Sequence, residues 1–206
     1  MNAHIKVDGK LITHREPKDY YLFYKPRGVV TSLSDPEGRP TVRDYFAHVH
    51  LRVFPVGRLD YDSEGLLLMT NDGELAHQLA HPSHEADKVY LVKVRGMIDE
   101  HALQRLRTGV HLDDGVTAPA KVKTVRTAES NCWVQVTLHE GRNRQIRRMF
   151  QQVGYPVLRL KRVAIYGLTA GSLKPGQYRR LQPEEISSLR EHIAKHTRKS
   201  KQDHTK

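Results

Sequence analysis

Short apolar runs, most of them bounded by Gly, Pro, Asn or Asp, dominate the pattern of this chain and predict strands rather than long helices. The predicted strands lie at residues 20–24, 66–70, 88–94, 120–126, 132–138 and 157–165. Helical patterns are limited to residues 74–80, residues 99–108, a segment after Gly141 and a final helix from about Glu184. Many strands with interspersed short helices indicate an α+β protein built on a largely antiparallel sheet.

The clearest helical pattern follows Gly141. Its apolar residues fall at i, i+3, i+4 and i+7 and therefore share one face, which consists of Ile146, Met149, Phe150 and Val153. The opposite face is basic and contains Arg144, Arg147 and Arg148, with no acid between Gly141 and Arg162. A solvated basic surface is one interpretation of this face. A surface that contacts nucleic-acid phosphates is the other.

Composition favours the second interpretation. The 206 residues contain 34 Lys and Arg against 23 Asp and Glu, which gives a formal charge of +11 and predicts attraction to polyanions. Apolar residues make up 38% of the chain, enough for a core, and the single cysteine excludes an internal disulfide framework. No apolar run reaches the roughly 20 residues of a membrane span, and the N-terminus has no apolar secretion segment. We therefore expect a cytoplasmic protein with no membrane contact.

Three acids, Asp60, Asp62 and Glu64, alternate in a segment bounded by glycines at positions 57 and 65. A charged turn between strands is the simplest interpretation. A calcium loop is excluded because it needs a bidentate Glu at its twelfth position, which here is Asn71. A zinc site is not expected either, since Cys132 is the one thiol and a site built with Glu85 on the clustered histidines would need unusual ligands (His77, His81 and His84). The sequence therefore predicts no metal.

Several motifs stand together in one order along the chain. They are Tyr24-Lys-Pro-Arg-Gly28, Gly57-Arg-Leu-Asp60, Ser63-Glu-Gly-Leu-Leu67, Thr70-Asn-Asp-Gly73, Lys88-Val-Tyr90, Glu140-Gly-Arg-Asn-Arg-Gln-Ile-Arg-Arg-Met149 and the segments 160–165 and 175–181. In order and spacing they resemble the bacterial branch of pseudouridine synthases that act on small- and large-subunit ribosomal RNA. The resemblance covers about residues 20–189.

The resemblance implies a pseudouridine synthase-like fold, in which a mixed sheet flanked by short helices forms two subdomains around a central cleft. Residues 18–189 would be the catalytic domain. Relatives often carry an N-terminal S4-type RNA-binding domain, so residues 1–17, where only Ile5 to Leu11 resembles the end of that domain, would be its remnant. Residues 190–206 form a basic tail that we expect to be solvated or disordered.

The resemblance also assigns site residues. Asp60 matches the catalytic aspartate, Tyr90 the tyrosine that stacks on the uracil, and Arg147 the arginine that pairs with the catalytic carboxylate. Tyr90 taken alone would be an ordinary sheet or core tyrosine. Arg58 resembles a residue that holds the target nucleotide out of its helix. The other expected RNA contacts are Lys25, Arg27, Arg142, Arg144, Arg148, Lys161 and Arg162.

The implied activity is the isomerisation of a uridine in ribosomal RNA, with 23S rRNA favoured over 16S rRNA. Since the uracil is only detached, turned and rejoined, no cofactor is expected. The expected partners are ribosomal RNA or ribosome assembly intermediates, and the protein is expected to be a monomer. Two alternatives remain open, a non-catalytic RNA-binding or ribosome-assembly protein on the same fold and a glycoside hydrolase with paired carboxylates.

Overall fold

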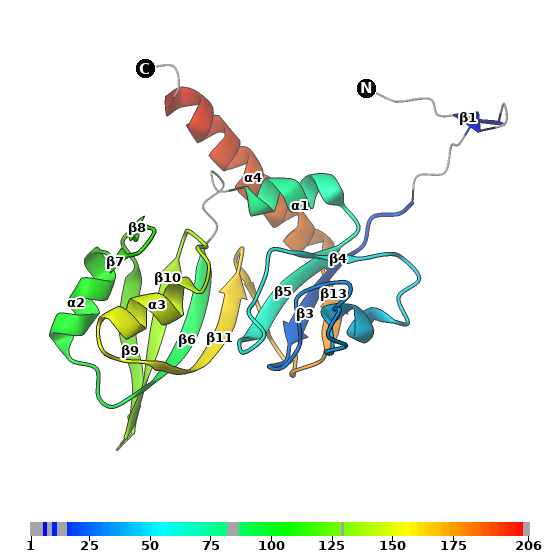
Figure 1. Cartoon of the computed structure of the whole chain (residues 1–206). Coiled ribbons are helices and arrows are strands. Elements are labelled where there is room, and N and C mark those ends of the chain that lie inside the picture. The colour runs from blue at the N-terminus through cyan, green and yellow to red at the C-terminus, as the bar shows by residue number, and fades with distance from the viewer. Residues whose placement is uncertain (1–5, 8–9, 12–15, 82–86, 129, 204–206) are drawn as a thin grey trace.

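The computed structural model describes residues 6–7, 10–11, 16–81, 87–128 and 130–203, and one mixed sheet forms its centre (Figure 1). The strands follow the order β13-β3-β5-β11-β6-β10-β9, with β4 paired to β5 and β12 paired to β11. Their bounds are β3 (Tyr20–Lys25), β4 (Phe54–Val56), β5 (Glu64–Thr70), β6 (Lys88–Arg95), β9 (Lys121–Ala128), β10 (Asn131–Leu138), β11 (Val157–Ile165), β12 (Leu168–Thr169) and β13 (Tyr178–Arg180). Two hairpins lie outside this sheet: β1 (Lys6–Val7) with β2 (Lys10–Leu11), and β7 (His111–Leu112) with β8 (Gly115–Val116).

The helices are short apart from the last. They are α1 (Gly73–Ala80), α2 (Glu100–Thr108), α3 (Gln145–Gln152) and α4 (Pro183–Asp203), with a 3₁₀ helix η1 (Val42–Phe46) that the sequence pattern did not predict. Asp72 and Asp99 cap α1 and α2, since each side chain accepts a hydrogen bond from a backbone N–H in the first turn. The predicted N-cap at Asp99 and the helix end before Gly109 are both confirmed.

The two halves of the sheet are joined by one parallel pair of strands, β5 and β11. β5 and β11 run in parallel through Lys161–Glu64 and Arg162–Gly65, while the other strand pairs of this sheet are antiparallel. The predicted α+β class with a largely antiparallel mixed sheet is therefore confirmed.

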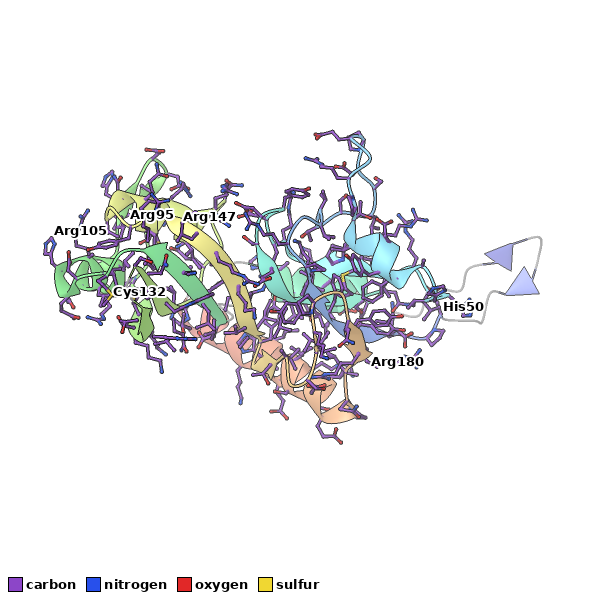
Figure 2. All side chains as sticks on the ribbon, turned by 90° about the horizontal axis from the view of Figure 1, so that it is seen from below. His50, Arg95, Arg105, Cys132, Arg147 and Arg180 are labelled. Atoms are coloured by element: carbon purple, nitrogen blue, oxygen red, sulfur yellow. The ribbon has the colours of Figure 1, made fainter. Side chains whose placement is uncertain are left out.

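The core divides at this junction. On one side, β6, β9, β10, α2 and α3 bury a single apolar cluster that includes Val92, Val134 and Phe150. On the other side, alternate residues of β3 and β5 point to opposite faces, so that Leu22 and Phe23 belong to different clusters. α4 covers one of these faces and η1 the other, and the two helices lie on opposite sides of the sheet (Figure 2). β11 joins the halves because Leu160 packs in the first cluster and Ile165 in the second.

The basic tail is the main departure from the expected fold. Residues 190–206 were expected to form a solvated or disordered basic tail, and in the part that the structure describes α4 continues to Asp203 as a helix. Leu189 and Ile193, four residues apart, share a helix face and are buried against the β3–β5 cluster. Charge composition alone gave too little weight to this apolar pair.

The β5–β11 junction requires glycine at position 65. Gly65 adopts φ +118°, a conformation that side chains other than glycine rarely adopt, and a Cβ there would overlap the backbone of Arg162, with the amide nitrogen 2.6 Å away. Because the obstacle is backbone within the sheet, it cannot move aside.

We expect Gly65→Ala to lower the free energy of unfolding by about 3 kcal/mol or more, since conformational strain and a backbone overlap act together. The matched control is Gly38→Ala, where φ is also positive (+69°) but no atom lies within 4 Å of the added Cβ. This control should cost about 1–2 kcal/mol. Denaturant unfolding of both variants measures the difference, and equal losses would contradict the packing argument.

Candidate active site

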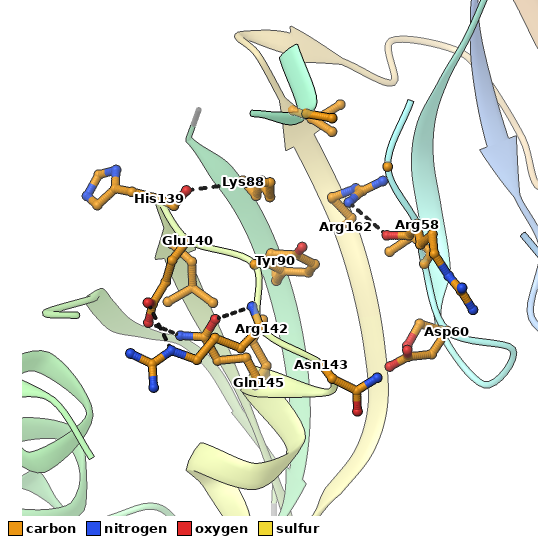
Figure 3. A pocket seen from close by; sticks show the side chains of 18 of the residues that line it. Arg58, Asp60, Lys88, Tyr90, His139, Glu140, Arg142, Asn143, Gln145 and Arg162 are labelled. Carbon is orange, nitrogen blue, oxygen red and sulfur yellow. Dashed lines mark hydrogen bonds and ion pairs between the residues drawn. The ribbon is translucent and has the colours of Figure 1, made fainter. Parts of the chain in front are cut away.

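A cavity of about 600 Å³ lies where the two halves of the molecule meet (Figure 3). Its volume is in the range typical of small-ligand sites. The lining comes from the loop before β5, the end of α1, the start of β6, the segment between β10 and α3, and β11 (residues 56–60, 63, 79–81, 88, 90, 138–146, 160, 162, 165 and 166). Asp60 and Tyr90 both line this cavity, as expected for a central cleft between two subdomains.

Asp60 lies on a loop whose backbone is fixed from one side by the segment after β3. Thr31 Oγ1 donates to the carbonyl oxygen of Leu59 at 2.6 Å, and the Gly28 N–H donates to the carbonyl oxygen of Tyr61 at 2.8 Å. The Ser63 N–H closes the turn on the Asp60 carbonyl oxygen at 3.0 Å. The Asp60 side chain remains 32% exposed. The loop is therefore held while its carboxylate stays accessible.

Two buried cations hold the same loop from below. Lys25, with 0% exposure, donates from Nζ to the carbonyl oxygens of Ser63 and Pro26, both at 2.9 Å. Arg162, with 2% exposure, donates from Nε to the Leu66 carbonyl oxygen at 2.7 Å and from Nη1 to the Arg58 carbonyl oxygen at 3.5 Å. Loss of hydration lowers the pKa of Lys25 to about 8, and the negative charges of Asp60 and Asp62 oppose this shift.

Arg144, which lies just before α3 in the half built on β6 and β10, contacts the loop that carries Asp60. Its Nη1 lies 3.5 Å from Asp60 Oδ2, and its guanidinium binds Asp62 through two hydrogen bonds of 3.2 Å. Arg144 directly precedes α3 and has φ +45°, a left-handed conformation that is uncommon for arginine. Such strain persists only where its surroundings enforce it, and here the ion pairs with two carboxylates accompany it.

Arg147 differs from the expectation. The resemblance implied a pair with Asp60, but Arg147 Nη2 lies 3.1 Å from Asp62 Oδ2 and donates to the Asp62 carbonyl oxygen at 3.0 Å. Arg144 is the guanidinium beside Asp60, because the left-handed residue before α3 directs it toward the loop. The implied Arg147–Asp60 contact is therefore replaced by Arg144–Asp60 and Arg147–Asp62.

Asp62 is a site residue that the sequence did not single out. Burial would raise the pKa of its carboxyl, but the hydrogen bond from Arg144 and the charges of Arg147 and Arg144 lower it overall. In the sequence, only its position two residues after Asp60 could have indicated that Asp62 belongs to the site. Asp62 therefore holds both arginines next to the catalytic candidate.

Tyr90 lies on β6, on the face that also carries Val92 and Val94, and it packs against the buried cluster of that half. Its ring is half-buried and lines the cavity. In Figure 3 it lies between Arg162 and the segment of Glu140 and Arg142, across the cavity from the loop that carries Asp60. The Tyr90 ring is thus part of the cavity wall.

The predicted RNA contacts fall into distinct groups. Arg27, Arg58 and Arg144 are exposed, and the last two line the cavity. Arg142 and Arg148 bind the β7–β8 hairpin instead. Arg142 Nη2 donates to the Val116 carbonyl oxygen at 2.7 Å, and Arg148 binds both carboxylate oxygens of Asp114 at 2.9 and 3.0 Å.

Lys25 and Arg162 depart from their predicted roles. Both were expected to contact RNA, but both are buried and donate to backbone carbonyl oxygens. Neither Lys25 nor the Nε of Arg162 can meet a phosphate that approaches from solvent. Lys161 is half-buried, with Nζ 5.4 Å from the centre of the Tyr24 ring.

Among the residues that the structure describes, no group of three or more His, Cys, Asp or Glu side chains could hold a metal ion. His84, one of the clustered histidines, lies outside the described residues. No helix within the described ranges is long and apolar enough to cross a membrane.

Comparison with known proteins points in one direction. The sequence model of the family described as "RNA pseudouridylate synthase" matches residues 19–152. The chain is 45% identical over 188 residues to "Ribosomal large subunit pseudouridine synthase B" of Bacillus subtilis (strain 168), covering 90% of this chain and 77% of the relative. It is 42% identical to the protein of the same name from Pseudomonas aeruginosa, covering 92% of this chain and 51% of the relative.

Solved structures agree with the sequence comparisons. "Crystal structure of pseudouridylate synthase" superimposes with a TM-score of 0.76 at 34% identity, covering 87% of this chain and 76% of that one. "Human RNA Pseudouridylate Synthase Domain Containing 1", at 15% identity and a TM-score of 0.54, covers 85% of each chain and shows the same fold.

The burial of Lys25 predicts a pH dependence of stability. Its pKa is about 8 in the folded protein and near 10.5 when unfolded, so the unfolded chain binds more protons between these values. The free energy of unfolding of the wild type, relative to Lys25→Met, should therefore rise from pH 8 to pH 10.5, by up to about 3 kcal/mol. Denaturant unfolding at pH 7 and pH 10.5 checks this, and a constant difference would contradict the buried ammonium.

Proposed function

Because the chain belongs to the RNA pseudouridylate synthase family, we propose that it converts a uridine of large-subunit (23S) ribosomal RNA into pseudouridine in the cavity around Asp60. The main support for the proposal is the geometry of one cavity. Asp60 and Tyr90 both line it, and Asp60 Oδ2 lies 3.5 Å from Nη1 of Arg144. The names of the two relatives support the large ribosomal subunit as the source of the substrate.

The reaction rearranges bonds without net gain or loss of atoms. The C1′–N1 bond of the uridine breaks, the uracil turns, and a C1′–C5 bond forms. C5 loses its proton and N1 gains one, so the reaction neither consumes nor produces a redox equivalent. The residues must therefore supply a charged group near the sugar, a surface that retains the detached uracil, and a route for one proton.

Asp60 is the group proposed to act at the sugar or the base. An ionised carboxylate can attack C1′ or C6, or it can assist elimination across the sugar, and each route needs the charged form. Arg144 places a permanently charged guanidinium 3.5 Å from Asp60 Oδ2. Asp62 accepts the two hydrogen bonds that Arg144 donates at 3.2 Å. Asp60 lies close to the same positive charge, and its carboxylate oxygens remain available to the substrate.

Tyr90 is proposed to retain the uracil once it is detached. Stacking of a base on an aromatic ring is worth about 1–3 kcal/mol and does not depend on the rotation of the base in its plane. A base can therefore turn over such a ring without losing the contact. Tyr90 packs against the buried cluster behind it, which holds the ring in a fixed position for the base to stack on.

The RNA has to present its target outside a helical stack, which costs a few kcal/mol. Arg27 and Arg58 are exposed, and Arg58 lines the cavity, where phosphate contacts can offset this cost. The cations that were expected to contact RNA but bind carbonyl or carboxylate oxygens of the chain itself have a positioning role in this proposal (Lys25, Arg142, Arg144, Arg148 and Arg162).

The proposal includes a monomeric enzyme in the cytoplasm, where ribosomal RNA is the substrate. A monomer is supported by the composition of the site, since one chain supplies Asp60, Tyr90 and Arg144. An excess of 34 Lys and Arg over 23 acids supports an RNA partner.

We expect Asp60→Ala to lower the rate of pseudouridine formation by at least about 1,000-fold while RNA affinity stays within about threefold, because the carboxylate acts in chemistry and not in holding the RNA. The control is Asp113→Ala, which removes one negative charge at an exposed position outside the cavity lining. Pseudouridine mapping on a ribosomal RNA fragment measures the rate, and the same incubation should release no free uracil.

Two outcomes would count against the proposal. Activity of Asp60→Ala close to that of the wild type would remove the catalytic role of this carboxylate. A wild-type protein that binds the RNA but forms no pseudouridine would favour the non-catalytic alternative, and release of free uracil would favour a hydrolase.

A further inference from the structure

A second surface with the chemistry of a nucleic-acid site lies on the reverse of the sheet from Tyr90. In β10, alternate residues such as Cys132 and Val134 are buried to 1% and 0% exposure in the core, whereas Trp133 is half-buried and points to the other face. Lys93 on β6 is half-buried on that same face, and Lys123 on β9 is exposed. We define the open face as the side of β9, β10, β6 and β11 that carries Trp133.

Strand register arranges the open face in two rows. The first row runs from β9 to β11 through Arg126, Trp133, Lys93 and Arg159, and the second through Lys123, Gln135, Leu91 and Lys161. Directly opposed residues have Cβ atoms about 5 Å apart. The rows are two residues apart on β6, β10 and β11, and three apart on β9, where a register shift opposite Trp133 and Val134 inserts one extra residue. The aromatic side chain of Trp133 is therefore flanked across both neighbouring strands by cationic residues.

No acid interrupts these rows. None of the sequences of β6, β9, β10 and β11 contains Asp or Glu. Glu64 on the adjoining β5 is bound to Arg159, with 2.9 Å between Oε1 and Nε, so that pair is locally neutral. Lys93 is half-buried and Lys123 and Arg126 are exposed, and the structure shows no ion pair for them among the described residues, so their charges give the open face a positive potential.

Protection of the sheet edge explains only part of this arrangement. Lysines on an edge strand prevent pairing with other sheets, and this accounts for Lys123 and Arg126 on β9. Trp133 and Lys93 lie on interior strands, where edge protection has no role. A half-buried tryptophan between cations combines base stacking with phosphate contacts, the two features by which proteins bind single-stranded nucleic acid without reading its sequence.

We propose that the open face binds a single-stranded segment of RNA, with one base stacked on Trp133 and its phosphates on Lys93, Lys123 and Arg126. The cavity lining includes none of these four residues, so this surface is separate from the site of Asp60. Its role is to hold RNA outside the target uridine. The inference does not rest on the proposed catalytic activity.

Trp133 provides its own probe because the chain contains a single tryptophan. The wild-type protein is titrated with single-stranded oligo(A), which contains no uridine, at low salt, and intrinsic fluorescence is recorded. Stacking of adenine on Trp133 should quench the emission in a saturable manner. Absence of quenching under conditions where fluorescence anisotropy of a labelled oligo(A) shows binding would overturn the proposal.

Charge variants separate this surface from general attraction. Lys93→Gln/Lys123→Gln removes two contacts of the open face, and affinity for oligo(A) should fall about tenfold or more. The slope of the logarithm of the binding constant against the logarithm of salt concentration should become shallower by about 1.4, since each phosphate contact on a single strand contributes about 0.7. The control Lys18→Gln/Lys174→Gln removes the same charge at two exposed positions elsewhere, and affinity should stay within about twofold.

An equal loss in the two double variants would contradict a defined site and leave only general charge attraction. Circular dichroism of each variant confirms that the fold is retained. Because the ligand has no uridine and the readout needs no turnover, failure here leaves the assignment of Asp60 unaffected, and failure of Asp60→Ala to lose activity leaves the open face unaffected.

Discussion

The active-site geometry depends on two cations that are buried beneath a single loop. Lys25 and Arg162 have almost no exposure, and both donate to carbonyl oxygens of the backbone between residues 58 and 66. Burying a charge costs several kcal/mol, and a hydrogen bond from a charged group contributes about 1.5–3 kcal/mol. The cost is offset in part because each cation has more than one acceptor, and because the carboxylates of Asp60 and Asp62 act on Lys25. Removing either cation would take away the hydrogen bonds that it donates to carbonyl oxygens of this loop.

The site is assembled from both halves of the molecule, and no single sequence motif supplies all of its residues. The loop with Asp60 belongs to the β3–β5 half, whereas Tyr90 and Arg144 belong to the half built on β6, β10 and α3. The halves join through the short parallel pairing of β5 with β11, where Gly65 lets the two backbones approach. A small shift at this junction would move the carboxylate relative to the ring and the guanidinium. In the proposed mechanism the buried cations therefore act on catalysis by positioning Asp60.

Sequence patterns predicted what depends on local order along the chain. The strand at residues 157–165, the cap at Asp99 and the apolar face of α3 follow from periodicity and cap residues, and the structure confirms them. The partner of Asp60 could not be derived in the same way, because the left-handed conformation of Arg144 and its contact with the Asp60 loop are tertiary features that no local pattern predicts. Lys25 and Arg162 were predicted to contact RNA, and nothing local to the sequence shows that both are buried and donate to backbone carbonyl oxygens.

Single-turnover pseudouridine formation by Arg162→Met tests the positioning of the loop most directly, with Arg162→Lys and RNA affinity measured alongside. The account predicts that Arg162→Met remains folded and binds RNA within about threefold of the wild type, while its rate falls by about 100-fold because Asp60 is displaced. Arg162→Lys, which keeps a buried donor, should recover part of the rate. A folded Arg162→Met variant that turns over within about twofold of the wild type would contradict the dependence of the site on its buried cations.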